Sequence, residues 1–481
     1  MLKYSNNVYV TLQTSFSSTE VSTMLINPAT GIYNTPFDCH SGHEGIVTLV
    51  DDAFNPSNLE IVRYRKLNTA TYGFSLKTLE RALESTSART WPSGTIVYQA
   101  PTKRVLENIQ LAYNAKNLIT NGNMSVDQRL CGGYKTNAGY GLDHWFLEQN
   151  TGTGRLRFKQ GVLASPWNPA FGLFNCLSVE VLTTDVTQSA GVYYHIGTRV
   201  EDRDMQVLNW GGSITGNSKQ AQTATLAFWV KHNLAGTHHV AIANRGHTRH
   251  MVLPYNIASA AVWYHKSLTI PPPHAAVSDE WRVSGTTGLH IYWNLGPLSQ
   301  TACTSAASVW VYDATYQKNF GYKDAANQMY TTATPIFELT GVTLYPGKQR
   351  IFADFEPFSI TLQRCQRYYE KSYNYDVTPG SVMTAGYCHR FRLTGLGNLG
   401  HNFVNNAHFK VLKRTTPSFT IYSPDTGTSG VTRDYDATPG DIAPITTQIF
   451  QTHAYVISQN SAAASYNVDG GFHWVADAEL T

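Results

Sequence analysis

The chain has 481 residues, and its 36 Lys and Arg against 33 Asp and Glu leave a formal net charge of +3. Charged residues make up 14% of the sequence and aromatic residues 12%, whereas soluble proteins average about 25% charged residues. This balance excludes a disordered chain, a long coiled coil and a nucleic-acid-binding protein, which needs a basic patch or stripe.

The first hundred residues are expected to form a small β domain. Short runs of β-prone residues between turn signals predict strands at 8–12, 46–50, 59–64 and 94–98. Between the last two strands, a leucine repeat at helical spacing predicts one short helix through Leu76, Leu79 and Leu83.

A helical connector is expected at 101–116. Val105, Ile109 and Ala112 fall on one face of this helix. The apolar stripe is equally consistent with a contact along the symmetry axis of an oligomer and with packing on the domain that precedes it.

The remaining residues again read as strands. Between 117 and 358 we expect strands at 223–230, 240–243, 266–270, 289–293, 308–312 and 337–344. A helix is predicted over 359–373, where Leu362, Cys365 and Tyr369 recur at helical spacing. Further strands are predicted at 390–393, 409–412, 418–422 and 471–475.

Many short strands with little helix predict an all-β protein built from sandwiches or jelly rolls. We expect a small N-terminal β domain at 1–100 and the helical connector at 101–116. A central jelly-roll-like β-sandwich is expected at 117–358, and a helix with a C-terminal β-sandwich at 359–481. The length agrees, since about 150 residues per domain gives three domains.

Targeting and redox features are sparse. The N-terminus lacks the apolar segment of a signal peptide, and no apolar run approaches the roughly 20 residues of a membrane span. We therefore expect a protein made in the cytoplasm, without membrane insertion. The six cysteines form no Cys-x-x-Cys pair, which favours free thiols over a disulfide framework.

Two histidine clusters raise the question of a metal site. His238, His239, His247 and His250 have no cysteine pair or carboxylate among them, so we favour surface or loop histidines over a zinc site. The run 39–44 (CHSGHE) brings three ligand types together. A site at an oligomer axis remains an alternative there, but a polar turn centred on Gly42 is favoured, and no metal is expected.

Catalytic motifs give no clear assignment. Asp202 with Asp204, and Asp434 with Asp436, would share one face of a strand, as paired carboxylates do in glycoside hydrolysis, but such pairs also arise on solvated loops. The glycine pattern at 395–400 (GLGNLG) precedes a poor helix start, so we interpret it as a turn and not as a dinucleotide-binding loop. No catalytic residue and no cofactor are expected.

Aromatic residues are the candidate ligand contacts, because exposed rings can stack on sugar rings. Tyr140, Trp145, Trp263 and Tyr264 are the candidates for carbohydrate binding. The alternative is that these rings belong to a core or an interface, as most Trp and Tyr of β-proteins do.

Several stretches, in consistent order, resemble bacteriophage tail fibre and receptor-binding proteins. In those proteins a run like 117–129 (NLITNGNMSVDQR) opens a β-sandwich and is followed by an aromatic motif like 143–145 (DHW). The likeness continues through 226–231, 337–344 and 355–357, is strongest at 362–372 (LQRCQRYYEKS), and returns in the ending 472–480. More weakly, 60–63 (EIVR) and 86–94 (TSARTWPSG) resemble a small virion-attachment module.

The resemblance implies a structural and adhesive fibre without catalysis. Such fibres are commonly homotrimers, joined through the N-terminal end to phage tail, baseplate or neck proteins, and their distal sandwiches touch host cell-surface glycans. The implied location is the virion. Two alternatives stay open: a tailspike-like enzyme that degrades polysaccharide, and a capsid decoration or vertex fibre, since this chain lacks a long shaft.

Overall fold

A computed structural model describes residues 8–26, 45–51, 57–64, 66–70, 73–77, 79–99, 117–149, 154–163, 172–184, 193–210, 221–273, 281, 285–295, 308–312, 335–348, 356–383, 388–394, 402–435, 440–444, 446–459 and 467–480. The chain divides into two compact units, Met1–Ala115 and Lys116–Thr481. The helical connector expected at 101–116 lies outside the described residues. The finer division of the second unit at residue 358 stays a prediction.

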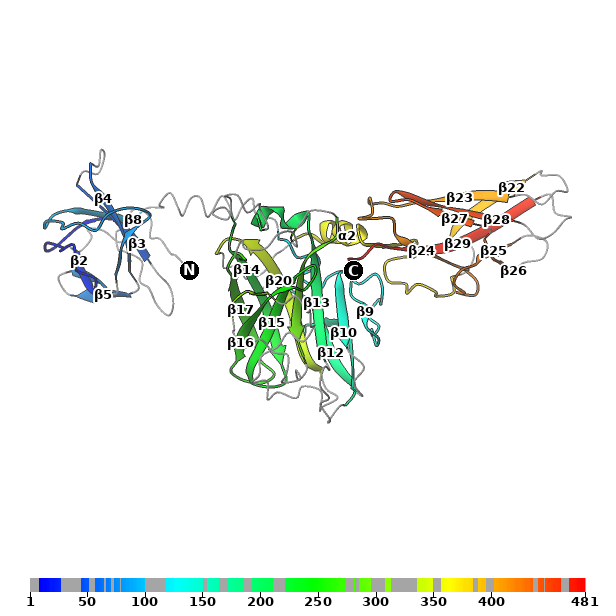
Figure 1. Ribbon diagram of the computed structural model, residues 1–481, viewed down its shortest axis with the longest axis horizontal. Helices are drawn as coiled ribbons and strands as arrows, with labels where there is room; N and C mark the ends of the chain where they lie inside the picture. Colours follow the sequence, from blue (N-terminus) through cyan, green and yellow to red (C-terminus); the bar gives the residue numbers. More distant parts are fainter. Residues whose placement is uncertain are drawn as a thin grey trace. The chain divides into compact units, whose positions relative to one another are not determined.

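The first unit contains two antiparallel sheets around one core (Figure 1). The five-stranded sheet has the order β1-β8-β3-β4-β7 and consists of β1 Val8–Thr11, β3 Gly45–Val50, β4 Leu59–Tyr64, β7 Glu80–Leu83 and β8 Ile96–Gln99. The three-stranded sheet has the order β2-β6-β5 and consists of β2 Thr23–Ile26, β5 Lys66–Ala70 and β6 Gly73–Lys77. The strands predicted in this unit are confirmed.

The helix predicted through the leucine repeat of the first unit is wrong. Leu76 lies in β6, where it pairs with Met24 of β2, and both side chains are buried in the core. Ala82 has a φ of 55°, which a right-handed helix does not allow. The apolar spacing therefore spans two strands, β6 with the buried Leu76 and β7 with the half-buried Leu83, and not one helical face.

The second unit opens with a sandwich of two antiparallel sheets. The seven-stranded sheet has the order β19-β16-β15-β18-β13-β10-β9 and consists of β9 Gly139–Tyr140, β10 Trp145–Gln149, β13 Tyr194–Glu201, β15 Gly236–Asn244, β16 Arg249–Ile257, β18 Thr287–Asn294 and β19 Val311–Tyr312. The five-stranded sheet has the order β11-β12-β20-β14-β17 and consists of β11 Arg155–Val162, β12 Asn175–Thr183, β14 Ala224–His232, β17 Trp263–Ile270 and β20 Pro335–Pro346.

Alternating apolar residues place the core between these two sheets. In β14, Leu226, Phe228 and Val230 are fully buried and belong to one large cluster that draws on both sheets. This follows from the two-residue period of a strand, which sends every second side chain to the same face. The ring of Phe228 meets Trp293 of the facing sheet at 5.4 Å between centroids. The expected β-sandwich class is confirmed.

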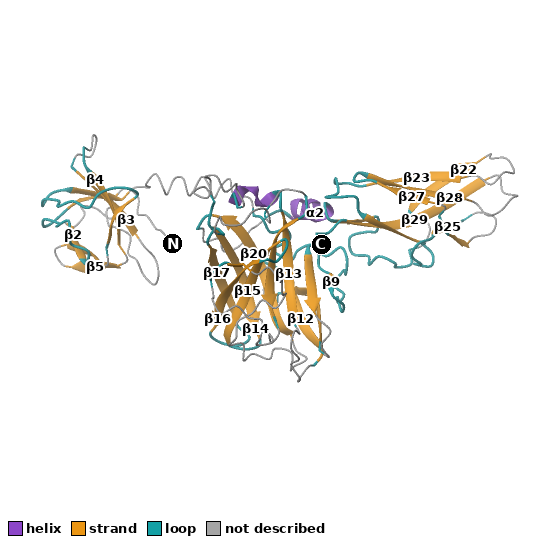
Figure 2. Ribbon diagram, in the orientation of Figure 1, coloured by secondary structure: helices purple, strands orange, loops and turns teal. Residues whose placement is uncertain are grey.

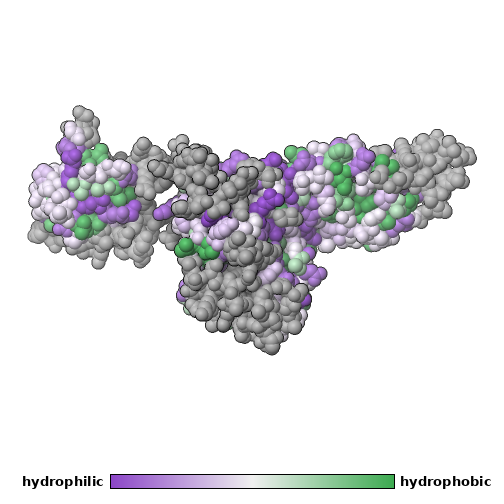
Figure 3. Space-filling model, viewed as in Figure 1, coloured by the Kyte–Doolittle hydropathy of each residue, from purple (hydrophilic) through white to green (hydrophobic). Residues whose placement is uncertain are grey.

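The C-terminal residues form a smaller pair of sheets. One contains β21 Tyr369–Lys371, β22 His389–Thr394, β24 Ser418–Tyr422, β25 Thr432–Asp434, β26 Gly440–Ile442 and β29 Asn467–Asp477. The other has the order β23-β28-β27, with β23 Asn402–His408, β27 Thr446–Ile449 and β28 His453–Gln459. Their core includes Phe472 and Trp474 of β29. On the visible face of this region, apolar residues lie among hydrophilic ones (Figure 3).

Two predicted elements of this region differ from the structure. The strand predicted at 409–412 is wrong, because β23 ends at His408. The backbone beyond it is engaged by side chains instead, since Lys410 N donates to Glu370 Oε1 (2.9 Å) and Val411 O accepts from Lys413 Nζ (3.1 Å). The predicted helix is α2 Phe358–Gln366, which ends early because β21 then pairs with β29.

Strands dominate the described residues, and the helices there are α2 and the short η1 Asp204–Leu208 (Figure 2). Within these parts of the chain, no helix has the length and apolar character to cross a membrane. The glycine pattern at 395–400 lies outside the described residues, but the segment that follows it is strand β23. The prediction that it opens no helix is therefore confirmed.

Candidate functional site

The stretch that begins the second unit is used to build the fold. Asn117 Oδ1 accepts from Ile119 N and Leu344 N (both 3.0 Å). Asn121 has a φ of 56°, and its Nδ2 donates to Val126 O at 2.8 Å. A Cβ on Gly122 would lie 2.0 Å from the carbonyl oxygen of Val342. The Asn117 and Asn121 side chains are therefore occupied by hydrogen bonds to the backbone, and Gly122 has no room for a side chain. Few polar groups of these residues are left to bind a ligand.

The end of the same stretch joins the C-terminus in a buried polar cluster. Arg129 donates to Asp477 (2.6 Å) and Glu479 (3.2 Å), and its guanidinium lies 3.8 Å from the centroid of the Tyr369 ring. The second oxygen of Glu479 lies 3.0 Å from His144 Nδ1. Burial disfavours the charged form of Glu479, but His144 and Arg129 overcome this and lower its pKa.

The helix α2 and β21 extend this cluster. Glu201 accepts from Arg367 Nε (3.0 Å) and Tyr368 OH (3.0 Å), and Arg364 Nη2 donates to Asn117 O at 3.0 Å. Beside them, burial raises the pKa of Asp143 to about 7. The three stretches that most resemble phage fibres therefore meet in one place, and their polar side chains hold it together.

In the first unit, the two stretches that resemble an attachment module also meet. Glu60 is fully buried and accepts from Arg81 Nε (2.8 Å), Trp91 Nε1 (2.8 Å) and Arg89 N (3.1 Å). Although burial opposes it, these hydrogen bonds lower the pKa of Glu60. Sequence reasoning did not identify Glu60 as the centre of a network, because nothing in the chain spacing shows that 60 and 81–91 are adjacent.

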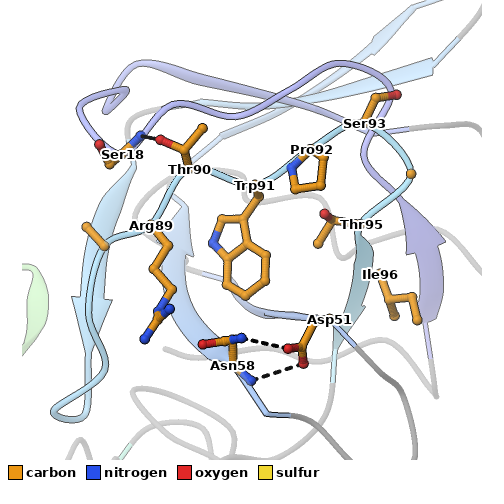
Figure 4. A pocket seen from close by; sticks show the side chains of 12 residues that line it. Ser18, Asp51, Asn58, Arg89, Thr90, Trp91, Pro92, Ser93, Thr95 and Ile96 are labelled. Atoms are coloured by element: carbon orange, nitrogen blue, oxygen red, sulfur yellow. Dashed lines mark hydrogen bonds between the residues drawn. The ribbon is translucent and has the colours of Figure 1, made fainter.

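A polar cavity of about 820 Å³ lies beside this network (Figure 4). Asp51 Oδ1 accepts from Asn58 N (3.0 Å) on one side, and Thr90 Oγ1 accepts from Ser18 N (3.2 Å) on the other. The indole of Trp91 is seen between them in Figure 4, but it is 4% exposed. The cavity is lined mainly by polar groups that already bond to each other.

The candidate metal and carboxylate residues have structural partners. His238 faces inward and stacks on His232 with centroids 3.6 Å apart, while Asp202 is buried and accepts from Gly285 N at 3.0 Å. Asp436 and the run 39–44 lie outside the described residues. In the part of the chain that the structure describes, no three His, Cys, Asp or Glu side chains are grouped so as to hold a metal ion.

The four predicted aromatic contacts fall into different environments. Trp145 is a correction: its ring is fully buried and lies 5.6 Å from that of Trp293 in a tilted arrangement, because its strand position faces the core. A ring without exposed surface does not bind a sugar. Trp263 packs against a small apolar cluster on the outer face of the five-stranded sheet, and Tyr264 packs against the edge of the main core. Both are partly exposed.

Tyr140 is the predicted contact that lines a cavity. The cavity measures about 370 Å³ and lies at the β9 edge of the seven-stranded sheet. Its lining consists of Ala138, Gly139, Tyr140, Phe146, Glu148, Gln149, Tyr193 and Arg199. Tyr140 lies directly opposite Phe146 across the strand pair, with the ring centroids 5.4 Å apart. Two strands thus supply one aromatic wall.

Arg199 fixes the geometry of this wall. Its guanidinium lies 4.1 Å from the Phe146 ring centroid, and its Nη1 donates to Tyr140 OH at 2.8 Å. Nη2 donates to Glu148 at 3.1 Å. Both Nη1 and Tyr140 OH also donate to the carbonyl oxygen of Leu480, each at 2.7 Å. The C-terminal segment therefore holds two lining residues in position.

Tyr193 forms the opposite aromatic element of the cavity. Its ring is partly exposed and stacks on His195, with centroids 5.0 Å apart. Burial and the carboxylate of Glu148 raise its pKa, so its hydroxyl stays protonated and can donate. Burial likewise raises the pKa of Tyr140. The site combines aromatic faces with hydroxyl, carboxylate and guanidinium groups.

Comparisons with known proteins add little at the sequence level: the chain matches no protein-family model and no curated protein. Among solved structures, the enzymatically active domain of tailspike protein 4 from bacteriophage CBA120 is 13% identical with a TM-score of 0.23, over 48% of this chain and 21% of that one. This chain therefore spans about a fifth of the tailspike.

Two carbohydrate-binding structures are similarly distant. The family 11 carbohydrate-binding module of a Clostridium thermocellum cellulosomal cellulase is 11% identical with a TM-score of 0.21, over 46% of this chain and 98% of the module. The tandem CBM22 domains of Paenibacillus barcinonensis Xyn10C are 9% identical with a TM-score of 0.21, over 74% and 93% of the two chains. Similarity at this level does not establish a function.

Proposed function

We propose that this protein is a non-enzymatic, glycan-binding fibre of a bacteriophage particle, and that the Tyr140 cavity contacts the glycan. The observation that carries the proposal is the arrangement of Tyr140, Tyr193 and Glu148 around one open cavity. Small-molecule sites combine apolar or aromatic walls with a few placed polar groups. A pyranose ring presents an apolar C–H face and a rim of hydroxyls, which match these two kinds of wall.

The fibre role is supported by the order and the contacts of the phage-like stretches. They meet in the cluster around Arg129 and Glu479, so the likeness concerns residues that determine this fold. The first unit is the proposed attachment part, which binds phage tail, baseplate or neck proteins. A homotrimer is the proposed assembly, and exposed apolar side chains such as Val382, Leu412 and Phe450 are available for subunit contacts.

Glycan binding is tested with purified full-length protein and host cell-surface polysaccharide. Tyr193→Ala removes one aromatic wall and is expected to weaken binding about tenfold, or about 1.4 kcal/mol. Tyr312→Ala is the matched control, because Tyr312 is 51% exposed and lies on the opposite edge strand of the same sheet. Equal affinity of both variants and the wild type would contradict the Tyr140 cavity as the site.

Two further measurements test the rest of the proposal. The mass of the full chain in solution should correspond to three copies, and a stable monomer at micromolar concentration would contradict the trimer. After incubation with the same polysaccharide, no new reducing ends should appear. Their appearance would favour the tailspike-like enzyme instead. Labelling intact virions distinguishes a tail position from a capsid position.

A further inference from the structure

A second cavity in the same unit is lined by different aromatic residues. It measures about 370 Å³, and its lining consists of Asn123, Ser125, Gly172, Leu173, Phe174, Asn175, Glu356 and Phe358. The Phe174 side chain is 61% exposed and that of Phe358 is 47% exposed. Neither residue is among the contacts predicted from the sequence, and the cavity shares no lining residue with the one at Tyr140.

The two phenylalanines are held in place although they are exposed. The ring of Phe358 packs edge-on against Tyr375, with centroids 5.5 Å apart. Tyr375 is itself anchored, because its hydroxyl accepts from Asp127 N (2.8 Å) and donates to Ser125 O (3.2 Å). On the other side, Phe174 precedes β12, and its carbonyl oxygen accepts from Leu163 N at 2.9 Å.

This exposure is costly unless something covers it. Burying a phenylalanine side chain stabilises a fold, and Phe174 and Phe358 forgo much of that gain because they are exposed. A single exposed apolar residue is ordinary. Two aromatic residues that line the same cavity, beside hydrogen-bonding groups, are typical of a small-molecule site.

The polar part of the lining is uncharged apart from one carboxylate. Asn123 Oδ1 accepts from Ser125 Oγ at 3.0 Å, which leaves the Asn123 amide group to donate. Glu356 is positioned by Thr361 Oγ1 (2.9 Å) and Arg364 Nη1 (3.2 Å). Its oxygens retain acceptor capacity, since a carboxylate accepts about four hydrogen bonds.

We propose that this cavity is a second carbohydrate site, which takes one neutral pyranose unit. Phe174 and Phe358 cover the C–H face of the ring, while Asn123 and Glu356 bond its hydroxyls. The lining contains no cationic side chain, so it offers no partner for the carboxylate of an acidic sugar. The volume lies near the lower end of the roughly 300–1,000 Å³ of ligand pockets, which fits a single small ligand such as one pyranose unit.

A second copy of the chain is the competing occupant, and the lining argues against it. A stable subunit interface buries about 800 Å² on each partner and has an apolar core with few charged residues. Here half of the lining residues carry polar side chains, and a carboxylate is among them. The polar cavity therefore fits a hydroxyl-rich ligand better than an apolar subunit surface.

The test uses the full-length chain with Tyr193→Ala in the background, so that the Tyr140 cavity is disabled. Saturation-transfer NMR is recorded with neutral methyl pyranosides and, separately, with methyl glucuronide. Neutral sugars should give a saturable signal, and glucuronide should give none. Adding Phe174→Ala or Phe358→Ala should remove at least about nine-tenths of the signal. Leu182→Ala, which changes a side chain that is 45% exposed elsewhere on β12, should leave it unchanged.

Three results would overturn the proposal. A Tyr193→Ala protein without a saturable signal would show that this cavity binds no neutral sugar. A signal that survives both phenylalanine variants would place the sugar elsewhere. A change of solution mass in either variant, with the sugar signal intact, would assign the surface to a subunit contact. The Tyr140 cavity is tested by the polysaccharide affinity of Tyr193→Ala against the wild type, whereas this cavity is tested by adding Phe174→Ala or Phe358→Ala, so the two sites can fail separately.

Discussion

Replacing Glu60 with glutamine should strongly destabilise the first unit. The Glu60 side chain is 0% exposed and that of its partner Arg81 is 4% exposed, so the pair is out of water. Arg81 donates to both carboxylate oxygens, at 2.8 Å and 2.6 Å, and Trp91 Nε1 donates at 2.8 Å. Glutamine keeps one acceptor oxygen, but its amide NH2 group replaces the other oxygen and faces the N–H donors of Arg81 or Trp91. The charge of Arg81 is then left without its anionic partner.

The expected loss follows from that uncompensated charge. Removing one partner of a buried ion pair costs about 3–5 kcal/mol. For a domain near 100 residues, each kcal/mol shifts Tm by about 4–8 °C, so the Tm of the first unit should fall by at least about 10 °C. Because the pKa of Glu60 is lowered in the fold, the contribution of its carboxylate to the free energy of unfolding is fully present above the usual glutamate pKa. This contribution is lost as the pH falls through the lowered pKa.

Differential scanning calorimetry of the full chain at pH 7 measures this directly. The transition of the first unit should move down, while that of the second unit serves as an internal control and stays in place. The double variant Glu60→Met with Arg81→Met should recover much of the loss, because it removes both charges. A shift below 2 °C in Glu60→Gln, or a double variant less stable than the single one, would refute the reasoning.

Three other predictions concern the second unit. Gly122→Ala should lower the urea midpoint of unfolding by several tenths of a molar or more, because the added Cβ would lie 2.0 Å from Val342 O. Gly133→Ala should lower the midpoint less, because the nearest atom to its Cβ would be 3.0 Å away. Glu479→Gln should cost about 3–5 kcal/mol in chemical unfolding, since an amide replaces one of the two oxygens that Arg129 and His144 contact, and the buried guanidinium loses one of its two carboxylate partners. His473 is fully buried and burial lowers its pKa to about 4, so it stays neutral in the fold while the unfolded chain takes up a proton below about pH 6.5. It should cost about 3 kcal/mol of stability as pH falls from 6.5 to 4, and His473→Asn should flatten a plot of unfolding free energy against pH over that range.

Strands with alternating apolar residues were predictable from the sequence. The alternation of Leu226, Phe228 and Val230 predicts strand β14, because a strand with one buried face has an apolar residue at every second position. The failures occurred where long-range contacts override a local pattern. Leu76 and Leu79 mimic a helix, and the backbone after His408 bonds to Glu370 and Lys413 instead of to a strand. No local spacing reports those partners.

The Tyr140 cavity was predictable only in part for a related reason. Tyr140 was a predicted aromatic contact, but Glu148 and Arg199 come from β10 and β13 of the same sheet, and Tyr193 directly precedes β13. Trp145 illustrates the opposite error: it is five residues from Tyr140, yet its position in β10 turns it to the core. Whether an aromatic side chain can contact a ligand or belongs to the core depends on its burial. The register of its strand determines that burial, because it sets which face of the sheet the side chain lies on.

Most residues of the stretches that resemble phage fibres are used to build the fold, but Asn123 and Glu356 of those stretches also line the Phe174 cavity. Asn121, Gly122 and Arg129 are tied to backbone carbonyls and buried carboxylates, so substitutions there damage the fold. Tyr193 and Phe174 have partly exposed rings that line cavities, so substitutions there cost little packing. Tyr193 and Phe174 can therefore change while the fold is kept. The coupling between the fold and the cavity is the Leu480 carbonyl, which joins the C-terminal segment to the Tyr140 wall through Arg199.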